Sequence, residues 1–383
     1  MYQSSRAWRG SLLAVTVVAV SLPVADGDPL AQQRERYTVT GSEVAVYNLA
    51  GVLRVVPGSG AAVTVEVTRG GRDADQLKVE TGPRGPLQTL RVIYPGRRVV
   101  YPEIGRSSNS SLEVSPDGTF GDHVKDILGF GGRRVVVTGG GSGLHAWADL
   151  RISVPKGQKI RVHHVAGDVN VANVEGTLAV DHAMGSLTTE GTKGTLVLDT
   201  GSGEVKVSKA RGDVTVDTGS GHVVVSDVRG TRLHLDTGSG GIQVDGAVVD
   251  ELVADTGSGN VHLTHIRARD VRLDTGSGSV HVDLDGDIER LVADTGSGGV
   301  TVAAPTDLGA RFEIDTGSGR IDVDFPHEVY QVERDHVSGK IGDGRGSIRI
   351  DTGSGGVRLL KRITSSARPP SAVLGMLAGP EIA

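Results

Sequence analysis

One pentapeptide, Asp-Thr-Gly-Ser-Gly, recurs through the second half of the chain and constrains its fold more than any other feature. Complete copies begin at Asp199, Asp217, Asp236, Asp255, Asp274, Asp294, Asp315 and Asp351. Degenerate copies begin at His163 (HHVAG), Asp181 (DHAMG) and Asp335 (DHVSG). From Asp199 to Asp315 successive copies are 18 to 21 residues apart. A period of this length is the signature of a protein built from stacked structural repeats.

Aliphatic residues hold fixed positions on both sides of the pentapeptide. They stand three residues and one residue before each Asp, as Leu233 and Leu235 do, and six and eight residues after it, as Ile242 and Val244 do. This period-two alternation predicts two short strands per repeat, each with one buried face. A single unit could not bury that face alone, but stacked units could. We therefore predict an all-β fold, a parallel β-solenoid of eleven 18–21-residue rungs from His163 to Asp351.

The first 25 residues have the three parts of a signal peptide. Arg6 and Arg9 give a positive start, residues 11–22 are apolar, and Pro23-Val24-Ala25 is the expected cleavage region. The apolar stretch is shorter than the roughly 20 residues that span a bilayer. An uncleaved membrane anchor is the alternative interpretation, and we expect no integral membrane span in the mature chain.

Composition divides the rest of the chain into segments. We predict a linker over 26–36, an irregular β-rich N-terminal segment over 37–99, a loop insertion over 100–134, the β-solenoid over 135–362 and a C-terminal tail over 363–383.

Two features of the N-terminal half bear on where the array begins. Residues 44–67 resemble a rung whose turn is the GSG at 58–60, with Leu53 and Val55 before it and the register shifted by one after it. Residues 144–154 alternate cleanly and place Trp147 on the polar face. We expect Trp147 to pack against the adjacent insertion, with a role as a binding anchor as the alternative.

Composition and charge exclude several classes of protein. The chain has no Cys, which excludes disulfides, thiol catalysis, iron–sulfur clusters and thiolate zinc sites. Its net charge is −6, and residues 181–362 alone hold 29 acidic and 19 basic residues. This balance argues against nucleic acid as a partner.

The repeated Asp invites a comparison with pepsin-like aspartic proteases, whose active-site signature is also Asp-Thr-Gly-Ser. Those enzymes need two buried carboxylates that share a proton. Here the motif recurs at every rung, so its role is structural and protease activity is excluded. We assign no catalytic, cofactor-binding or metal-binding residue.

Stacking places one Asp per rung in a column from Asp181 to Asp351. Carboxylates about 5 Å apart repel one another by roughly 1–3 kcal/mol, depending on the effective dielectric. We expect hydrogen bonds from the turn N–H groups to these Asp side chains to offset the repulsion. A row of bound cations such as Ca²⁺ is the second interpretation, although this repeat lacks the pattern of calcium-binding β-rolls.

Other candidate residues allow a structural and a functional interpretation. His163 and His164 are expected to point to opposite faces, whereas His262 and His281 share an outward position one rung apart and form either a solvated face or part of a metal site.

The Thr column is a minor candidate for an ice-binding face. It comprises Thr200, Thr218, Thr237, Thr256 and Thr275. An acidic corner is the candidate catalytic cluster of a polysaccharide-acting enzyme. It comprises Asp283, Asp285, Asp287 and Glu289.

Repeated DTGSG rungs behind a signal peptide, with VAVYNLAG and LRVIYP upstream, resemble the bacterial "putative adhesin" family over about residues 37–360. The resemblance implies a β-solenoid in an exported or envelope protein, and it brings no catalytic residues. We therefore expect a non-enzymatic exported scaffold, in the periplasm, at the cell surface or outside the cell. Its expected partner is a glycan, another envelope component or a second copy of itself. The alternative is a polysaccharide lyase or glycosidase on the same fold.

Overall fold

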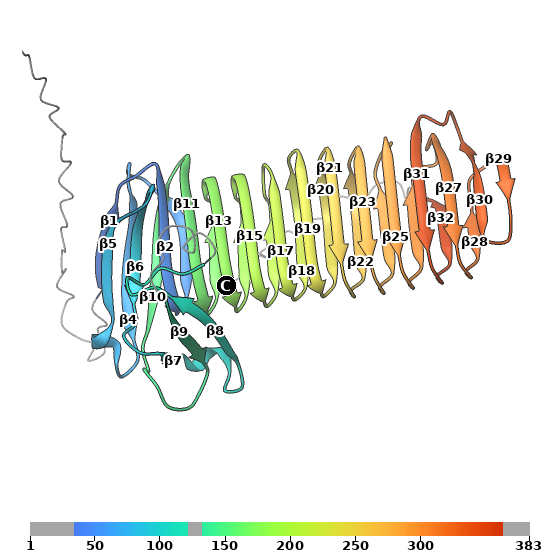
Figure 1. The fold of residues 1–383 in the computed structure, drawn as a ribbon. Helices are drawn as coiled ribbons and strands as arrows, with labels where there is room; N and C mark the ends of the chain where they lie inside the picture. The colour runs from blue at the N-terminus through green and yellow to red at the C-terminus, as the bar shows by residue number, and fades with distance from the viewer. Residues whose placement is uncertain (1–33, 122–131, 363–383) are drawn as a thin grey trace, which may run out of the picture.

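The structure is a computed structural model that describes residues 34–121 and 132–362. The signal peptide predicted over 1–25 and the tail predicted over 363–383 therefore lie outside the described residues. Strands stack along one axis into a long rod with a small three-stranded sheet beside its N-terminal end (Figure 1). Within the described residues the only helical segments are two short 3₁₀ turns, Ala74–Gln76 and Pro102–Ile104.

The sheet that carries the repeated Asp, called the Asp sheet here, has 15 strands. In spatial order from the N-terminal end they are β5 (Lys78–Arg84), β6 (Leu87–Ile93), β2 (Glu43–Ala50), β11 (Gln158–Ala166), β13 (Glu175–Met184), β15 (Lys193–Ser202), β17 (Val214–Ser220), β19 (Arg232–Ser239), β21 (Glu251–Thr256), β23 (Asp270–Thr275), β25 (Arg290–Thr295), β31 (Gly346–Thr352), β27 (Ala310–Thr316), β30 (His336–Ile341) and β29 (His327–Val332).

The opposite sheet has 14 strands. In the same direction they are β1 (Arg34–Val39), β4 (Val63–Gly70), β10 (Trp147–Pro155), β3 (Leu53–Gly58), β12 (Val169–Ala172), β14 (Leu187–Glu190), β16 (Val205–Ser208), β18 (Val223–Arg229), β20 (Ile242–Val248), β22 (Val261–Arg267), β24 (Val280–Leu284), β26 (Val300–Ala304), β32 (Val357–Lys361) and β28 (Ile321–Val323).

The predicted β-solenoid is confirmed. Successive rungs pair in parallel with equivalent residues opposite one another, so that Asp217 lies beside Asp236 and Asp236 beside Asp255. The predicted aliphatic columns form the core, since Leu235 and Val244 are completely buried. Each rung thus covers the apolar face of the next, as the logic of a solenoid requires.

The array begins one rung earlier than predicted, because β2 and β3 form a rung. Tyr47 lies opposite His163 in parallel register, and Leu53 lies opposite Val169. The turn of this rung lies between β2 and β3 rather than at residues 58–60, so the predicted turn and the predicted register shift are wrong. The prediction failed because Tyr47 and Asn48 replace the Asp and Thr of the complete pentapeptide copies.

The degenerate copy at Asp335 is not a rung, which corrects the sequence prediction. His336 begins β30, which pairs antiparallel with β27 and with β29. Alternation with period two is the same in parallel and antiparallel strands, so the pattern alone could not distinguish them. The number of rungs remains eleven, because the rung of β2 and β3 replaces this one.

The last rung of the described chain does not lie at the end of the rod. Strand β31 pairs in parallel with β25 on one side and with β27 on the other, and β32 lies likewise between β26 and β28. After β26 the chain therefore forms β27 and β28 two rung positions further along the rod, with one position between them and β25 and β26. It then adds the antiparallel hairpin of β29 and β30 and returns to fill the space (Figure 1).

A column of glycines explains much of the glycine content. A Cβ on Gly259 would lie 1.6 Å from the carbonyl oxygen of Gly240, and a Cβ on Gly167 would lie 2.0 Å from that of Gly51. That oxygen is a main-chain atom of the preceding rung, so a side chain at either glycine would force the backbones of the two rungs apart. The column comprises Gly51, Gly167, Gly185, Gly203, Gly221, Gly240, Gly259, Gly278, Gly298, Gly355 and Gly319.

The segment expected to be a loop insertion, 100–134, contains ordered strands. Strands β7 (Arg98–Val100), β9 (Arg133–Thr138) and β8 (Asn109–Val114) form the three-stranded sheet, and residues 122–131 lie outside the described part. Tyr101 and Phe120 from this segment are buried. The Trp147 ring lies 5.6 Å from that of Tyr101, centroid to centroid. Trp147 is half-buried and packs against the insertion, as predicted.

Candidate functional site

The repeated Asp residues form a column along the outer face of the Asp sheet. It runs through Asp181, Asp199, Asp217, Asp236, Asp255, Asp274, Asp294, Asp351 and Asp315. Neighbouring parallel strands are about 4.8 Å apart, so the carboxylates form a regular row. Asp255, Asp274 and Asp294 are exposed. The row gives this face a linear array of negative charge.

The electrostatics of the column show the repulsion that its geometry implies. Partial burial, and then the charges of Asp274 and Asp236, raise the pKa of the Asp255 carboxyl. Partial burial, and then the charges of Asp274 and Asp351, raise the pKa of the Asp294 carboxyl. A positive charge bound beside the column would relieve this repulsion. The column is therefore suited to cationic groups.

The Thr after each Asp points inward and not to solvent. Thr237, Thr256 and Thr275 are fully buried, which removes the basis for an ice-binding face. The Thr256 hydroxyl donates to the Gly240 carbonyl at 2.9 Å and accepts the N–H of Gly259 at 3.0 Å. From Thr256 onward Thr therefore makes the turn hydrogen bond that we expected Asp to make.

The same pentapeptide closes its turn in two ways. In the rungs of Gly203, Gly221 and Gly240, the last glycine of the pentapeptide has a φ of +124° to +154°. Within the described residues, the buried hydroxyls of Thr200 and Thr218 have no hydrogen-bond partner. From Gly259 onward the last glycine of the pentapeptide donates its N–H to the Thr hydroxyl at each rung.

His163 and His164 point to opposite faces of the strand, as predicted, and both are buried. The His163 ring stacks on Tyr47 at 4.6 Å between centroids, and its Nδ1 lies 3.1 Å from Asp181. Phe120 from the insertion packs edge-on against the same ring, which explains why this outward position is covered.

His164 and His182 occupy the inner column where later rungs have Thr. Burial, with a smaller contribution from the charge of His182, lowers the pKa of His164 well below its usual value. Burial also lowers the pKa of His182 to about 4. Both imidazoles are therefore neutral in the folded protein near pH 7.

His262 and His281 stack with ring centroids 4.8 Å apart and an interplanar angle of 14°. His281 Nε2 also lies 3.2 Å from the Asp283 carboxylate. Among the described residues, no further carboxylate or imidazole joins them within metal-ligand spacing. The structure thus favours a solvated pair of stacked rings over a metal site at this position.

The carboxylates of the acidic corner do not converge on a common point. Asp283 faces His281 and Asp285 pairs with Arg362. Asp287 lies 3.6 Å from Arg345, and Glu289 lies 3.9 Å from Arg269. Separate ion pairs of this kind stabilise a surface and do not form the paired carboxylates that glycoside hydrolysis requires.

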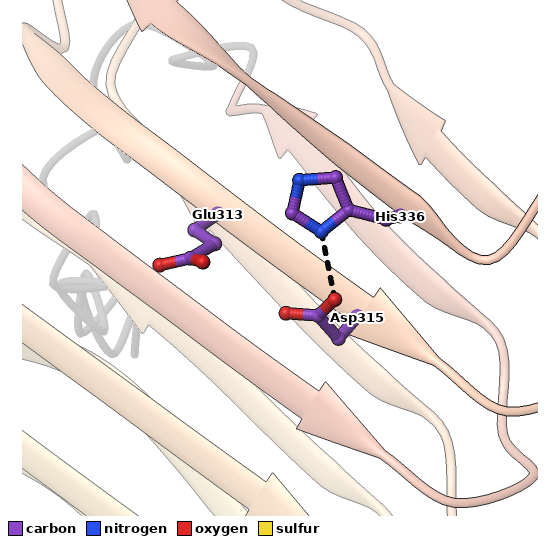
Figure 2. A group of neighbouring side chains, drawn as sticks. All are labelled: Glu313, Asp315 and His336. Carbon is purple, nitrogen blue, oxygen red and sulfur yellow. Dashed lines mark hydrogen bonds and ion pairs between the residues drawn. The ribbon is translucent and has the colours of Figure 1, made fainter. Parts of the chain in front are cut away.

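A cluster that the sequence did not reveal lies where the Asp column ends. Glu313 and Asp315 project from the same face of β27, and His336 approaches them from β30 (Figure 2). His336 Nδ1 is 2.7 Å from an Asp315 carboxylate oxygen, and one ligand atom from each of the three residues lies within 4.8 Å of the others. The hydrogen bond to Asp315 raises the pKa of His336.

An open hollow of about 590 Å³ adjoins this cluster. Its lining includes Asp315 and His336 together with Asp351, Glu333 and Asp335. On the opposite sheet, a hollow of about 310 Å³ is lined by His222, Gln243, Asn260 and His262 among others. Both are open surface hollows; the first is lined mainly by polar groups, and the second also by Val223, Val224 and Ile242.

Geometry and topology define a β-solenoid with a charged outer face. Residues 148–360 match the Toastrack DUF4097 family, and the chain belongs to this family. The resemblance to "putative adhesin" proteins is confirmed at the level of the family. No match was found among curated proteins.

Two solved structures were also matched. One is described as a putative cell adhesion protein from Clostridium sporogenes ATCC 15579, at 10% identity and a TM-score of 0.17, with 86% of this chain and 100% of that chain covered. The other is described as a putative adhesin from Parabacteroides distasonis ATCC 8503, at 13% identity and a TM-score of 0.31, with 83% of this chain and 96% of that chain covered. In residues 34–121 and 132–362, no helix is long and apolar enough to cross a membrane.

Proposed function

We propose that this protein is a non-enzymatic, exported β-solenoid scaffold of the bacterial envelope, and that its Asp column binds a glycan that carries amino groups. The observation that carries the proposal is the in-register row of carboxylates along one face of the rod. A polymer with regularly spaced cationic groups could contact several rungs at once. Simultaneous weak contacts of this kind increase affinity through effective concentration.

The charge of the column supports a cationic ligand. The raised pKa values of Asp255 and Asp294 report carboxylates that repel one another, and an amino group placed between them would reduce that repulsion. The hollow at the C-terminal end of the Asp column is open to solvent, which suits a long ligand lying along the rod better than a small molecule enclosed by it.

Binding of chitosan oligomers to the immobilised protein tests the proposal, with cello-oligosaccharides as the neutral comparison. A variant with four column carboxylates converted to amides should lose at least about tenfold in chitosan affinity, equivalent to about 1.4 kcal/mol. The four substitutions are Asp217→Asn, Asp236→Asn, Asp255→Asn and Asp274→Asn.

A matched control removes the same number of charges away from the column. It carries Asp75→Asn, Glu113→Gln, Asp307→Asn and Asp322→Asn, all at exposed positions. This control should bind chitosan almost as well as the original protein at physiological salt. Equal affinity of the original protein and the column variant would refute binding through the column.

Export is a separate part of the proposal and rests on Arg6, Arg9 and the apolar residues 11–22. Cell fractionation and the intact mass of the mature protein test it. We expect the protein outside the cytoplasm with residues 1–25 removed. A full-length cytoplasmic protein would contradict export.

The enzymatic alternative has no supporting site in the described residues. The carboxylates of the acidic corner point to separate basic partners, as Asp287 does to Arg345 and Glu289 to Arg269. Incubation with uronate polymers and amino-polysaccharides should therefore release no reducing sugar. Release that disappears in an Asp285→Asn variant would establish the enzymatic alternative instead.

A further inference from the structure

The C-terminal end of the Asp column differs chemically from the rest of the column. At the other rungs each column Asp has neighbours on parallel strands, whereas Asp315 has the antiparallel strand β30 on its outer side. This reversal places His336, and not another Asp, opposite Asp315. An imidazole thereby joins two carboxylates, Glu313 and Asp315, at one point of the surface (Figure 2).

The spacing of the three groups fits a common metal ion. Ligand atoms around a tetrahedral Zn²⁺ with bonds of 2.0–2.1 Å lie about 3.3 Å apart. In the structure, one donor atom from each residue lies within 4.8 Å of the other two, and His336 Nδ1 is 2.7 Å from Asp315. Small rotations of exposed or half-buried side chains are enough to close the difference, since Glu313 is exposed.

The kinds of donor present favour Zn²⁺ over Ca²⁺. Imidazole nitrogen is a common zinc ligand, whereas Ca²⁺ prefers six to eight oxygen ligands. Three protein ligands leave a fourth position for water or for a group of a bound ligand, as open zinc sites do. Further carboxylates that line the adjoining hollow, including Asp351 and Glu333, add negative charge around the cation.

Two similar pairs elsewhere on the rod lack the third ligand. His265 Nδ1 lies 2.9 Å from Asp245, and His281 Nε2 lies 3.2 Å from Asp283. Among the described residues, only Glu313, Asp315 and His336 form a group of three metal-ligating side chains at this spacing. These pairs therefore serve as internal controls for a site that needs all three groups.

We infer that Glu313, Asp315 and His336 form a zinc-binding site that connects β27 to β30. Because β30 belongs to the hairpin that ends the Asp sheet, a bound Zn²⁺ would cross-link that hairpin to the last parallel rung. This inference does not depend on the glycan proposed above, since it concerns the metal ion alone.

Isothermal titration of the untagged, metal-free chain with ZnCl₂ and with CaCl₂ tests the inference. We expect one equivalent of Zn²⁺ to bind saturably and Ca²⁺ to bind at least tenfold more weakly. Zinc affinity should fall at least tenfold in His336→Gln and in Glu313→Gln. In hydrogen exchange, the amides of residues 336–341 should become better protected when Zn²⁺ is added to the original protein.

Two variants control for other kinds of binding. Asp274→Asn removes a carboxylate of the column, and Asp245→Asn removes the partner of His265; both should retain the zinc affinity of the original protein. Should His336→Gln fail to fold, the exposed Glu313→Gln still tests the site. Absence of zinc binding, unchanged affinity in either site variant, or an equal loss in Asp274→Asn would each overturn the inference.

Discussion

The first rungs and the middle rungs share a backbone design but differ in the polar residue that they bury. In the middle rungs the inner column is Thr, and from Thr256 onward its hydroxyl bonds both within its own turn and to the preceding rung. In the first rungs the same column holds Asn48, His164 and His182. Asn48 bonds instead to Ala148 of β10 and accepts a hydrogen bond from Tyr94.

This difference shows how a repeat array ends without losing its stacking. From Thr256 onward the repeating rungs satisfy the inner Thr hydroxyl with copies of the same two bonds, so any of these rungs can follow another. In the rung of β2 and β3, Asn48 is instead satisfied by β10 and by Tyr94, which lie outside the repeat, and these bonds fix the N-terminal cap in one arrangement. Hydrogen bonds between adjacent rungs, as at Thr256, can be repeated along the array. The hydrogen bonds of Asn48 to Ala148 and Tyr94 occur once and hold the end of the array against the cap.

The glycine column is common to both regions, and its disruption should have the largest effect. In Gly259→Ala the new Cβ would lie 1.6 Å from the Gly240 carbonyl oxygen. We expect unfolding to become easier by more than about 3 kcal/mol, since the backbone of two rungs must separate. Chemical denaturation measures this. Gly286→Ala, whose Cβ would meet only the Arg267 side chain at 3.8 Å, should change stability little; equal effects would disprove the role of stacking.

Lowering the pH should change the folding stability of the first rungs and of the middle rungs in opposite directions. The pKa of buried His182 is about 4 in the folded protein against an ordinary value of 6.5. Only the unfolded state takes up a proton between these values, so stability falls as the pH falls from 6.5 to 4, by up to about 3 kcal/mol. The raised pKa of Asp255 acts the other way, because its protonation in the folded state relieves repulsion as the pH falls through that value.

Denaturation at a series of pH values measures the acid effect. His182→Thr gives the first rungs the inner residue of the middle rungs and should remove the His182 share of the stability loss below pH 6.5, while buried His164, whose pKa is also lowered, retains its own share. Thr256→Ser, which leaves the buried histidines in place, should retain the full loss. An identical pH dependence for His182→Thr and the original protein would show that His182 does not cause it.

Removing one inner polar side chain should reduce the free energy of unfolding more in the first rungs than in the middle rungs. Asn48→Ala leaves the buried Ala148 carbonyl without its Asn48 donor and removes one of the two acceptors of the Tyr94 hydroxyl, at about 2 kcal/mol. Thr256→Ala should lose about 1 kcal/mol, because Gly240 and Gly259 are half-exposed and can bond to water. Melting curves of the two variants test this order, and a larger loss in Thr256→Ala would reverse the comparison.

The smallest expected effect is a gain in stability. Asp274 contributes to the raised pKa of both Asp255 and Asp294. Asp274→Asn should therefore stabilise the middle rungs by about 0.5 kcal/mol at low salt, and the gain should shrink at high salt. Asp245→Asn is the control, since it removes the partner of His265 and brings no such gain. A stability loss in Asp274→Asn would contradict net repulsion in the column.

The fold was predictable because a period of 18 to 21 residues and a two-residue alternation leave few architectures open. The position of β31 was not, because nearly identical rungs fit any place in the stack equally well. The cluster at His336 was hidden for a related reason. The letters DHVSG matched a rung, and only the antiparallel pairing of β30 reveals that His336 faces Asp315.

The buried state of His163 was also beyond the sequence pattern. Alternation assigns it to the outer face correctly, but Phe120 from a distant segment covers that face. A segment that does not repeat, such as the one that carries Phe120, can cover a rung without leaving any periodic pattern in the sequence. The same holds for Asn48, whose partners Tyr94 and Ala148 are 46 and 100 residues away.

Strands β31 and β32 lie between rungs that precede them in the sequence, and this position sets the order in which the rod can be completed. A chain synthesised from its N-terminus makes β27 and β28 before residues 346–361 exist, so β25 and β27 lack their final partner strand until that segment is made. Completion is thus an insertion step, and incomplete chains carry open strand edges that are prone to aggregation and accessible to proteases.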